Sequence, residues 1–176
     1  MSAGGIEPDT KDWTWVLSRP CPECGFDASA IAREEVADLI RRDADEWIRR
    51  LDAPHAAVRS RPGVWSTLEY GCHVRDVHRV FNERVTLMLT QHEPLFADWD
   101  QDRAAIDAEY AAQNPGVVAG ELFDAAVTVA DTYSSVPPDG WSRQGLRGNG
   151  SEFTVASIAL YHAHDVVHHA WDVDEH

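Results

Sequence analysis

The sequence has no apolar run that approaches the roughly 20 residues a helix needs to cross a bilayer. Basic residues are also few, because 15 Lys and Arg stand against 30 Asp and Glu, for a formal net charge of −15 at pH 7. Nucleic-acid binding requires clustered Lys and Arg to neutralise phosphates, and anionic membrane surfaces attract the same residues. We therefore expect neither nucleic acid nor a membrane as a partner.

Cysteine is scarce as well, with three residues in a chain of 176. A small, odd number favours a reducing compartment over a disulfide framework. The first residues also lack the basic and apolar regions of a secretory signal. We therefore expect a cytoplasmic protein.

Cys21 and Cys24 form a C-P-E-C-G sequence that resembles one half of a zinc knuckle. A closed structural zinc site needs four ligands, and the chain has no second pair of cysteines. Three interpretations stay open, and a tight turn that anchors the N-terminal arm is the favoured one. The others are a knuckle completed by histidines or by another subunit, and a redox-active pair, whose usual strand-to-helix context is missing.

Strand-like alternation, internal repeats and the common catalytic signatures are also lacking. The sequence has no Ser-His-Asp order with a supporting motif, no phosphate-binding glycine loop and no dinucleotide fingerprint. The pattern that remains is helical periodicity, in which apolar residues recur every three or four positions. The predicted helices cover residues 29–51, 66–89, 98–113, 117–133 and 154–173, with a loop at 136–152.

These segments predict an all-α protein with one domain, a four-helix bundle at residues 29–173. An irregular N-terminal arm at residues 1–28 precedes it, because prolines and a glycine interrupt any period there. The arm's aromatic residues Trp13, Trp15 and Phe26 are expected to hold it against the bundle. A chain of this length with 44% hydrophobic residues can bury a core without disulfides.

Four of the nine histidines lie within eight residues of the last predicted helix. At about 100° per residue, His164 and His168 lie about 40° apart on the apolar face, whereas His162 and His169 lie roughly opposite. On the helix at 66–89, His73 also projects to the apolar side. Core-facing imidazoles from two helices can converge on one divalent ion, and three ligands leave a coordination position open for chemistry.

Other polar residues near these histidines have more than one interpretation. Glu69 is either a further ligand, an acceptor behind a ligand, or the capping residue of an S-T-L-E capping box. Asp165 either orients a ligand imidazole or lies in solvent, and His169 either supports a ligand from behind or has a structural role. Arg143 and Arg147 in the last loop could bind a carboxylate, although a solvated loop is the favoured interpretation.

Two short motifs give the chain a resemblance to a known family. The sequence from Trp65 to His73 (WSTLEYGCH) and the sequence from His164 to His169 (HDVVHH) resemble the helix-two and last-helix signatures of the DinB-like superfamily. The resemblance implies a bundle of up-up-down-down type in which His73, His164 and His168 bind zinc, nickel or a similar ion, often in a homodimer. The relatives include mycothiol-dependent maleylpyruvate isomerase and bacillithiol transferases.

The chain departs from the isomerase pattern at two places. That pattern has Glu where this chain has His164, and the Arg-Gly-Gln that often follows the last ligand is replaced by His169-Ala-Trp-Asp172. Both differences leave the substrate, and mycothiol as a co-substrate, undetermined by the resemblance.

Three functional hypotheses follow. The leading one is a metalloenzyme whose ion activates a mycothiol-type thiol or water for transfer, isomerisation or hydrolysis of a small molecule. The second is a non-catalytic metal-binding or small-molecule-binding stress-response protein. The third is a redox-responsive interaction protein that works through Cys21 and Cys24.

Overall fold

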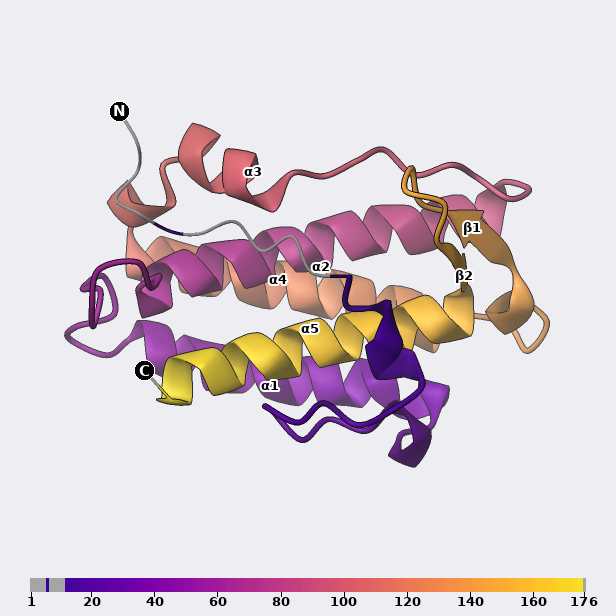
Figure 1. The fold of residues 1–176 in the computed structure, drawn as a ribbon, viewed down its shortest axis with the longest axis horizontal. Helices are drawn as coiled ribbons and strands as arrows, with labels where there is room; N and C mark the ends of the chain where they lie inside the picture. The colour runs from indigo at the N-terminus through magenta and orange to yellow at the C-terminus, as the bar shows by residue number, and fades with distance from the viewer. Residues whose placement is uncertain (1–5, 7–11, 176) are drawn as a thin grey trace.

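Four long helices form the body of the computed structural model, which describes Ile6 and residues 12–175 (Figure 1). These are α1 (Val36–Leu51), α2 (Thr67–Thr90), α4 (Pro115–Ser134) and α5 (Val155–Glu175), and a short α3 (Gln101–Asp107) lies between α2 and α4. The all-α bundle predicted from the sequence is confirmed. Among the described residues, no helix has the length and apolar content needed to span a membrane.

The direction of α1 relative to its neighbours follows from two ion pairs. Arg41, near the start of α1, pairs with Asp131 near the end of α4 at 2.7 Å, so these helices are antiparallel. Arg50, near the end of α1, pairs with Asp174 near the end of α5 at 2.8 Å, so these helices are parallel. Both α1 and α2 pack against α4 and α5.

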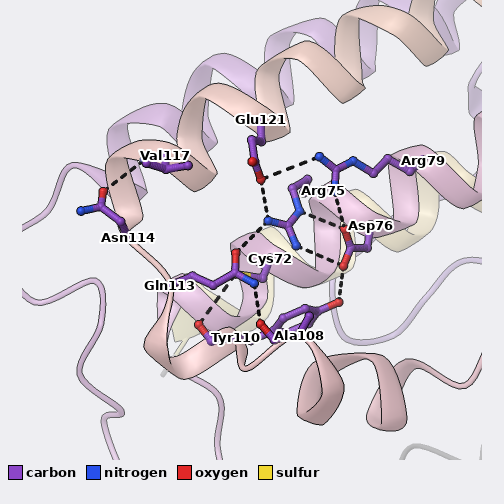
Figure 2. Close-up of polar contacts among 10 residues, drawn as sticks. All are labelled: Cys72, Arg75, Asp76, Arg79, Ala108, Tyr110, Gln113, Asn114, Val117 and Glu121. Atoms are coloured by element: carbon purple, nitrogen blue, oxygen red, sulfur yellow. Dashed lines mark hydrogen bonds and ion pairs between the residues drawn. The ribbon is translucent and has the colours of Figure 1, made fainter.

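The direction of α2 follows in the same way. Arg75 near the start of α2 donates a hydrogen bond of 2.7 Å to Glu121 near the start of α4, so α2 and α4 are parallel (Figure 2). His78 on α2 contacts His162 on α5 at 3.0 Å, in the antiparallel sense. The order along the chain is therefore up-down-down-up, and the expected up-up-down-down type is wrong.

The connections explain this order. Residues 52–66 stay at one end of the bundle, whereas residues 91–114 run back along its length before α4 begins (Figure 1). Tyr110 in this long connection donates a hydrogen bond of 2.5 Å to Asp76 on α2, and Arg75 holds Gln113 at 2.8 Å (Figure 2). Helical periodicity carries no information about the path of a connection, so the sequence could not predict this.

Local chemistry determines where the helices begin and end. Ser66 and Glu69 form the predicted capping box at the start of α2. By contrast, α1 begins at Val36 rather than at Ser29, because short 3-10 turns and extended backbone occupy residues 28–35. The predicted helix at 98–113 is also divided, since Glu109 adopts a left-handed conformation with φ of 48° between α3 and a 3-10 turn.

The loop expected at 136–152 contains a small hairpin instead of irregular chain. Strands β1 (Gln144–Leu146) and β2 (Glu152–Thr154) pair antiparallel directly before α5. Three-residue strands are too short to give the alternation by which strands are recognised in a sequence.

The described part of the N-terminal arm crosses α5 (Figure 1). It contains 3-10 turns at Thr14–Leu17 and Ala28–Ala30, both of which contact α5. Phe26 is buried and Trp13 and Trp15 pack against the core, as expected from the sequence. Residues 1–5 and 7–11 of the predicted arm lie outside the described residues, as does His176. The arm therefore places Cys21 and Cys24 beside the last helix.

Candidate metal centres

The four histidines of α5 lie in three different environments. His162 is completely buried, with its Nε2 atom 3.0 Å from Nδ1 of His78 and its Nδ1 atom 3.1 Å from the hydroxyl of Tyr133. Burial lowers the pKa of His78 to about 3 and holds the pKa of His162 well below its ordinary value. These two imidazoles are therefore neutral core residues that hydrogen-bond one another across α2 and α5.

His73, Asp165 and His169 form a second group, here called the histidine–aspartate cluster. One ligand atom from each lies within 4.8 Å of the others. Oδ1 of Asp165 is 3.9 Å from Nε2 of His73 and 3.4 Å from Nε2 of His169. The rings of His73 and His169 meet edge to face, with centroids 4.6 Å apart. Two nitrogens and one oxygen thus converge between α2 and α5.

The surroundings keep His73 neutral and fixed. Its side chain is fully buried between the rings of Trp65 and Trp99, whose centroids lie 5.4 and 5.6 Å from its own. Burial, with a smaller contribution from His169, holds the pKa of His73 well below its ordinary value. Within the described residues, neither of its nitrogens has a hydrogen-bond partner. A buried, neutral imidazole without such a partner is suited to bind a metal ion.

The second imidazole of this cluster is oriented from behind. Nδ1 of His169 lies 3.0 Å from Oδ2 of Asp172, one turn further along α5. When Nδ1 carries the proton and donates it to this carboxylate, Nε2 presents its lone pair toward Asp165 and His73. This is the arrangement by which outer carboxylates orient metal-binding histidines.

Cys21, Cys24, His164 and His168 form a third group, here called the cysteine–histidine cluster. One ligand atom from each of these four residues lies within 4.8 Å of the others. Sγ of Cys21 is 3.7 Å from Nδ1 of His168, and the rings of His164 and His168 have centroids 5.1 Å apart. Burial lowers the pKa of His164 to about 4 and lowers that of His168, so both are neutral at pH 7.

A pocket of about 880 Å³ opens beside both clusters. A volume of this size suits a small organic molecule. Its lining includes Asp165 and His169 of one cluster, His164 and His168 of the other, and the cation of Arg147. The further lining residues are Trp13, Glu23, Trp99, Asp100, Gln101, Asp102, Arg103, Ile106, Tyr161, Trp171 and Asp172.

The structure divides the triad predicted from the family resemblance. His164 and His168 lie with the two cysteines of the arm, and His73 lies with Asp165 and His169; within the described residues the three predicted ligands do not form one such group. A metal ion shared by His73, His164 and His168 stays a prediction, and the geometry favours the two separate clusters.

The other predicted residues are placed as follows. Glu69 caps α2 and also pairs with Arg59, so its carboxylate is occupied at the helix start. Arg143 donates hydrogen bonds to the backbone carbonyls of Met88 and Gln91, which leaves Arg147 as the loop arginine that lines the pocket.

One signal in the sequence could have identified the histidine–aspartate cluster. Asp165 and His169 have the same four-residue spacing as His164 and His168, shifted by one position. The isomerase pattern carries an acidic residue at the first of these positions, and a one-residue shift puts Asp165 there. The helical projection favoured His164 and His168 because it locates the apolar face of α5, but it cannot say which neighbour of α5 each pair faces.

Comparisons with known proteins identify the fold. YfiT from Bacillus subtilis, described as a probable metal-dependent hydrolase with an unusual four-helix bundle topology, matches with a TM-score of 0.59 and 18% identity over 98% of this chain and 92% of that one. Mycothiol-dependent maleylpyruvate isomerase matches with a TM-score of 0.60 and 14% identity over 81% of this chain. These likenesses establish the shared fold.

This chain spans 61% of the length of the isomerase. A comparison of the sequence with curated proteins gives no significant match. The family model of the DinB superfamily, however, matches residues 36–173, which include the four long helices of the bundle apart from the last two residues of α5. The chain belongs to the DinB superfamily.

Proposed function

We propose that the protein is a metal-dependent enzyme whose divalent ion is held by His73, Asp165 and His169. The observation that carries the proposal is the convergence of their ligand atoms within 4.8 Å, with Asp165 and His169 at the wall of the pocket and His73 buried behind them. Two imidazoles and one carboxylate are a ligand set found in catalytic zinc sites, where the fourth position stays open. Zinc and nickel are the ions that we expect.

Each residue of the cluster has a distinct task in this proposal. His73 supplies a neutral imidazole from α2, and Asp165 supplies a negative charge that offsets part of the charge of the ion. His169 supplies its Nε2 atom when its Nδ1–H donates a hydrogen bond to Asp172. When bound, the ion lowers the pKa of a coordinated water or thiol and so generates a nucleophile near neutral pH.

The pocket supports a small molecule as the substrate. Arg147 offers a positive charge at the pocket wall that can pair with an anionic group, and carboxylates such as Asp100 and Asp102 line the same pocket. A hydrolase would use water at the open position, in line with the description of YfiT. A mycothiol-type thiol at the same position would support transfer or isomerisation, in line with the description of the isomerase. We propose one of these two nucleophiles as the reactant.

The test combines metal analysis with an activity screen. Metal content is measured for the wild type, for His73→Ala and for the control His92→Ala, whose side chain is exposed. We expect His73→Ala to lose one ion per chain and His92→Ala to lose none. Esters, amides and electrophiles are then screened with water, mycothiol and bacillithiol as nucleophiles, before and after chelation.

The outcomes separate the alternatives. Turnover that disappears in His73→Ala and after chelation supports the proposed enzyme. Turnover that survives both treatments refutes the metal mechanism. A bound ion without turnover in the whole screen favours the non-catalytic binding protein instead.

A further inference from the structure

We propose that Cys21, Cys24, His164 and His168 form a second, structural zinc site that ties the N-terminal arm to α5. The inference does not rest on the proposed function, because none of its four ligands belongs to the histidine–aspartate cluster. It assigns one role to the C-P-E-C sequence of the arm and to His164 and His168 of α5.

The geometry of the four residues fits tetrahedral zinc. In a tetrahedral site, Zn–S bonds of about 2.3 Å and Zn–N bonds of about 2.0 Å place a sulfur and a nitrogen ligand about 3.5 Å apart. Sγ of Cys21 and Nδ1 of His168 are 3.7 Å apart. The four ligand atoms all lie within 4.8 Å of one another. One ion can therefore reach all four with small adjustments.

A tight turn of the arm presents the two cysteines, and α5 presents the two histidines. Gly25 donates its backbone N–H to the carbonyl of Cys21 at 3.0 Å and has φ of +73°, a conformation that glycine adopts readily. The Cys21 N–H donates in turn to the carbonyl of Phe26 at 2.8 Å, which closes the turn. On α5, a spacing of four residues puts both imidazoles on one face. Each unit offers two ligands toward the other.

Burial explains why a metal accounts for these side chains better than a hydrogen-bonded core. Cys21, His164 and His168 are buried, and Nε2 of His164 has no hydrogen-bond partner in the described part of the chain. A disulfide between Cys21 and Cys24 would leave that buried nitrogen as it is. A zinc ion would satisfy both imidazoles and both sulfurs at once.

Zinc-binding histidines usually donate their second ring N–H to a carboxylate or carbonyl, and Glu23 offers such a carboxylate to His168. Nδ1 of His168 faces Cys21, and its Nε2 atom lies 3.3 Å from a carboxylate oxygen of Glu23. When Nε2 carries the proton, it donates to this carboxylate and leaves the Nδ1 lone pair directed at the ion. Glu23, which lies between the two cysteines in the sequence, thus fixes the tautomer that the site requires.

The charges of the site balance. On binding, Cys21 and Cys24 each release one proton to solvent, and the two thiolates neutralise the two positive charges of zinc. The two imidazoles are neutral ligands, so the complex carries no net charge. Four protein ligands leave no open position, and zinc has no redox chemistry, which makes the role structural rather than catalytic.

The site would also shape the pocket. Trp13 and Glu23 of the arm line the same cavity as Asp165 and His169. The ring of Trp13 packs on those of His164 and His168, with centroids 5.6 and 4.9 Å apart. Zinc would therefore hold one wall of the pocket in place from a distance, without touching a reactant.

The experiment uses cobalt(II) as a spectroscopic substitute for zinc in the full chain. Metal-free protein is titrated with Co²⁺, and the near-ultraviolet thiolate-to-cobalt charge-transfer band is recorded with the visible bands of tetrahedral cobalt. We expect one thiolate-bound cobalt per chain in the wild type and in His73→Ala. We expect the band to vanish in the double variant Cys21→Ser/Cys24→Ser and to persist in the matched control Cys72→Ser, which removes the third, buried cysteine.

Two outcomes would overturn the proposal. One is a wild type that shows no thiolate-to-cobalt band on titration, and the other is a band that persists in the double variant. Retention of the band in His73→Ala also separates this site from the proposed catalytic ion, whose loss in that variant is measured independently.

A second measurement covers the case in which the double variant fails to fold. In the wild type, limited proteolysis within the arm is compared with Zn²⁺ present and after chelation, and far-ultraviolet circular dichroism reports on the bundle. We expect chelation to speed cleavage in the arm by at least about tenfold while the helices persist. A cleavage rate that does not respond to zinc would contradict the tether.

Discussion

The residues that α5 contributes to the two clusters differ by a shift of one position, yet they face different neighbouring elements. His164 and His168 face the N-terminal arm, where two sulfurs bring the group to four potential metal ligands. Asp165 and His169 are rotated by about 100° and face α2, where His73 completes a set of three. Ligand spacing on one helix therefore does not identify a site, because the neighbouring element determines how many ligands it has and whether a position stays open.

Removing one imidazole from each cluster in turn tests this comparison most strongly. We expect His169→Ala to lower kcat/KM by about 10³-fold, or about 4 kcal/mol of transition-state stabilisation, because the activating ion is lost. His164→Ala should lower it less than about tenfold, through the shape of the pocket wall. The measurement is kcat/KM with the substrate found in the screen. A larger loss of kcat/KM in His164→Ala than in His169→Ala would instead support an ion held by His73, His164 and His168.

Zinc-dependent stability gives the next effect. A ligand that binds only the folded state at 100 times its Kd stabilises by about 3 kcal/mol. We therefore expect the free energy of unfolding of His73→Ala, measured with denaturant, to rise by about this amount on addition of Zn²⁺. Cys21→Ser/Cys24→Ser in the His73→Ala background should show no increase. An equal increase in both proteins would mean that the cysteines do not bind the ion.

A smaller effect is expected from the carboxylate behind His169. Asp172→Asn removes the acceptor that fixes the His169 tautomer, and such changes typically weaken metal binding by 10–100-fold. We expect this loss in a competition titration with a metal-binding dye in the Cys21→Ser/Cys24→Ser background, which reports on the histidine–aspartate cluster alone. Asp124→Asn, at an exposed position on α4, is the control and should leave the affinity unchanged.

The pair of His78 and His162 should respond to acid rather than to metal. Because burial lowers the folded-state pKa of His78 from 6.5 to about 3, its contribution to stability is full above pH 6.5 and is lost as the pH falls toward 3. Between pH 7.5 and pH 5.5 we expect it to cost about 1 kcal/mol of unfolding free energy. His78→Asn should reduce this acid-dependent loss, and His55→Asn, at an exposed position, should not. Identical pH dependence in all three proteins would contradict the prediction.

Much of the fold could be predicted from residues that act locally. Ser66 and Glu69 mark the start of α2, and the period of α5 places its histidines on definable faces. The path of the long connection at 91–114 could not be predicted, because it depends on contacts such as that of Tyr110 with Asp76.

The site was predicted only in part for a related reason. The sequence identified His73 and the two histidine pairs, but their grouping depends on the angle at which α5 faces α2 and the arm. Cys21 lies 147 positions from His168, and nothing in the local sequence of either indicates that they meet. His78 is fully buried, where His162 of α5 offers it a polar partner that the sequence of α2 alone does not indicate.

The wide separation of Cys21 and His168 also has a consequence for biosynthesis. A ribosome adds roughly 5–20 residues per second, so several seconds pass between the two residues. During that interval the thiols of the arm have been made but their imidazole partners have not. For the proposed zinc site to form, both thiols therefore have to stay reduced until α5 has been made, and the two proposed ions can be bound only once α5 has folded.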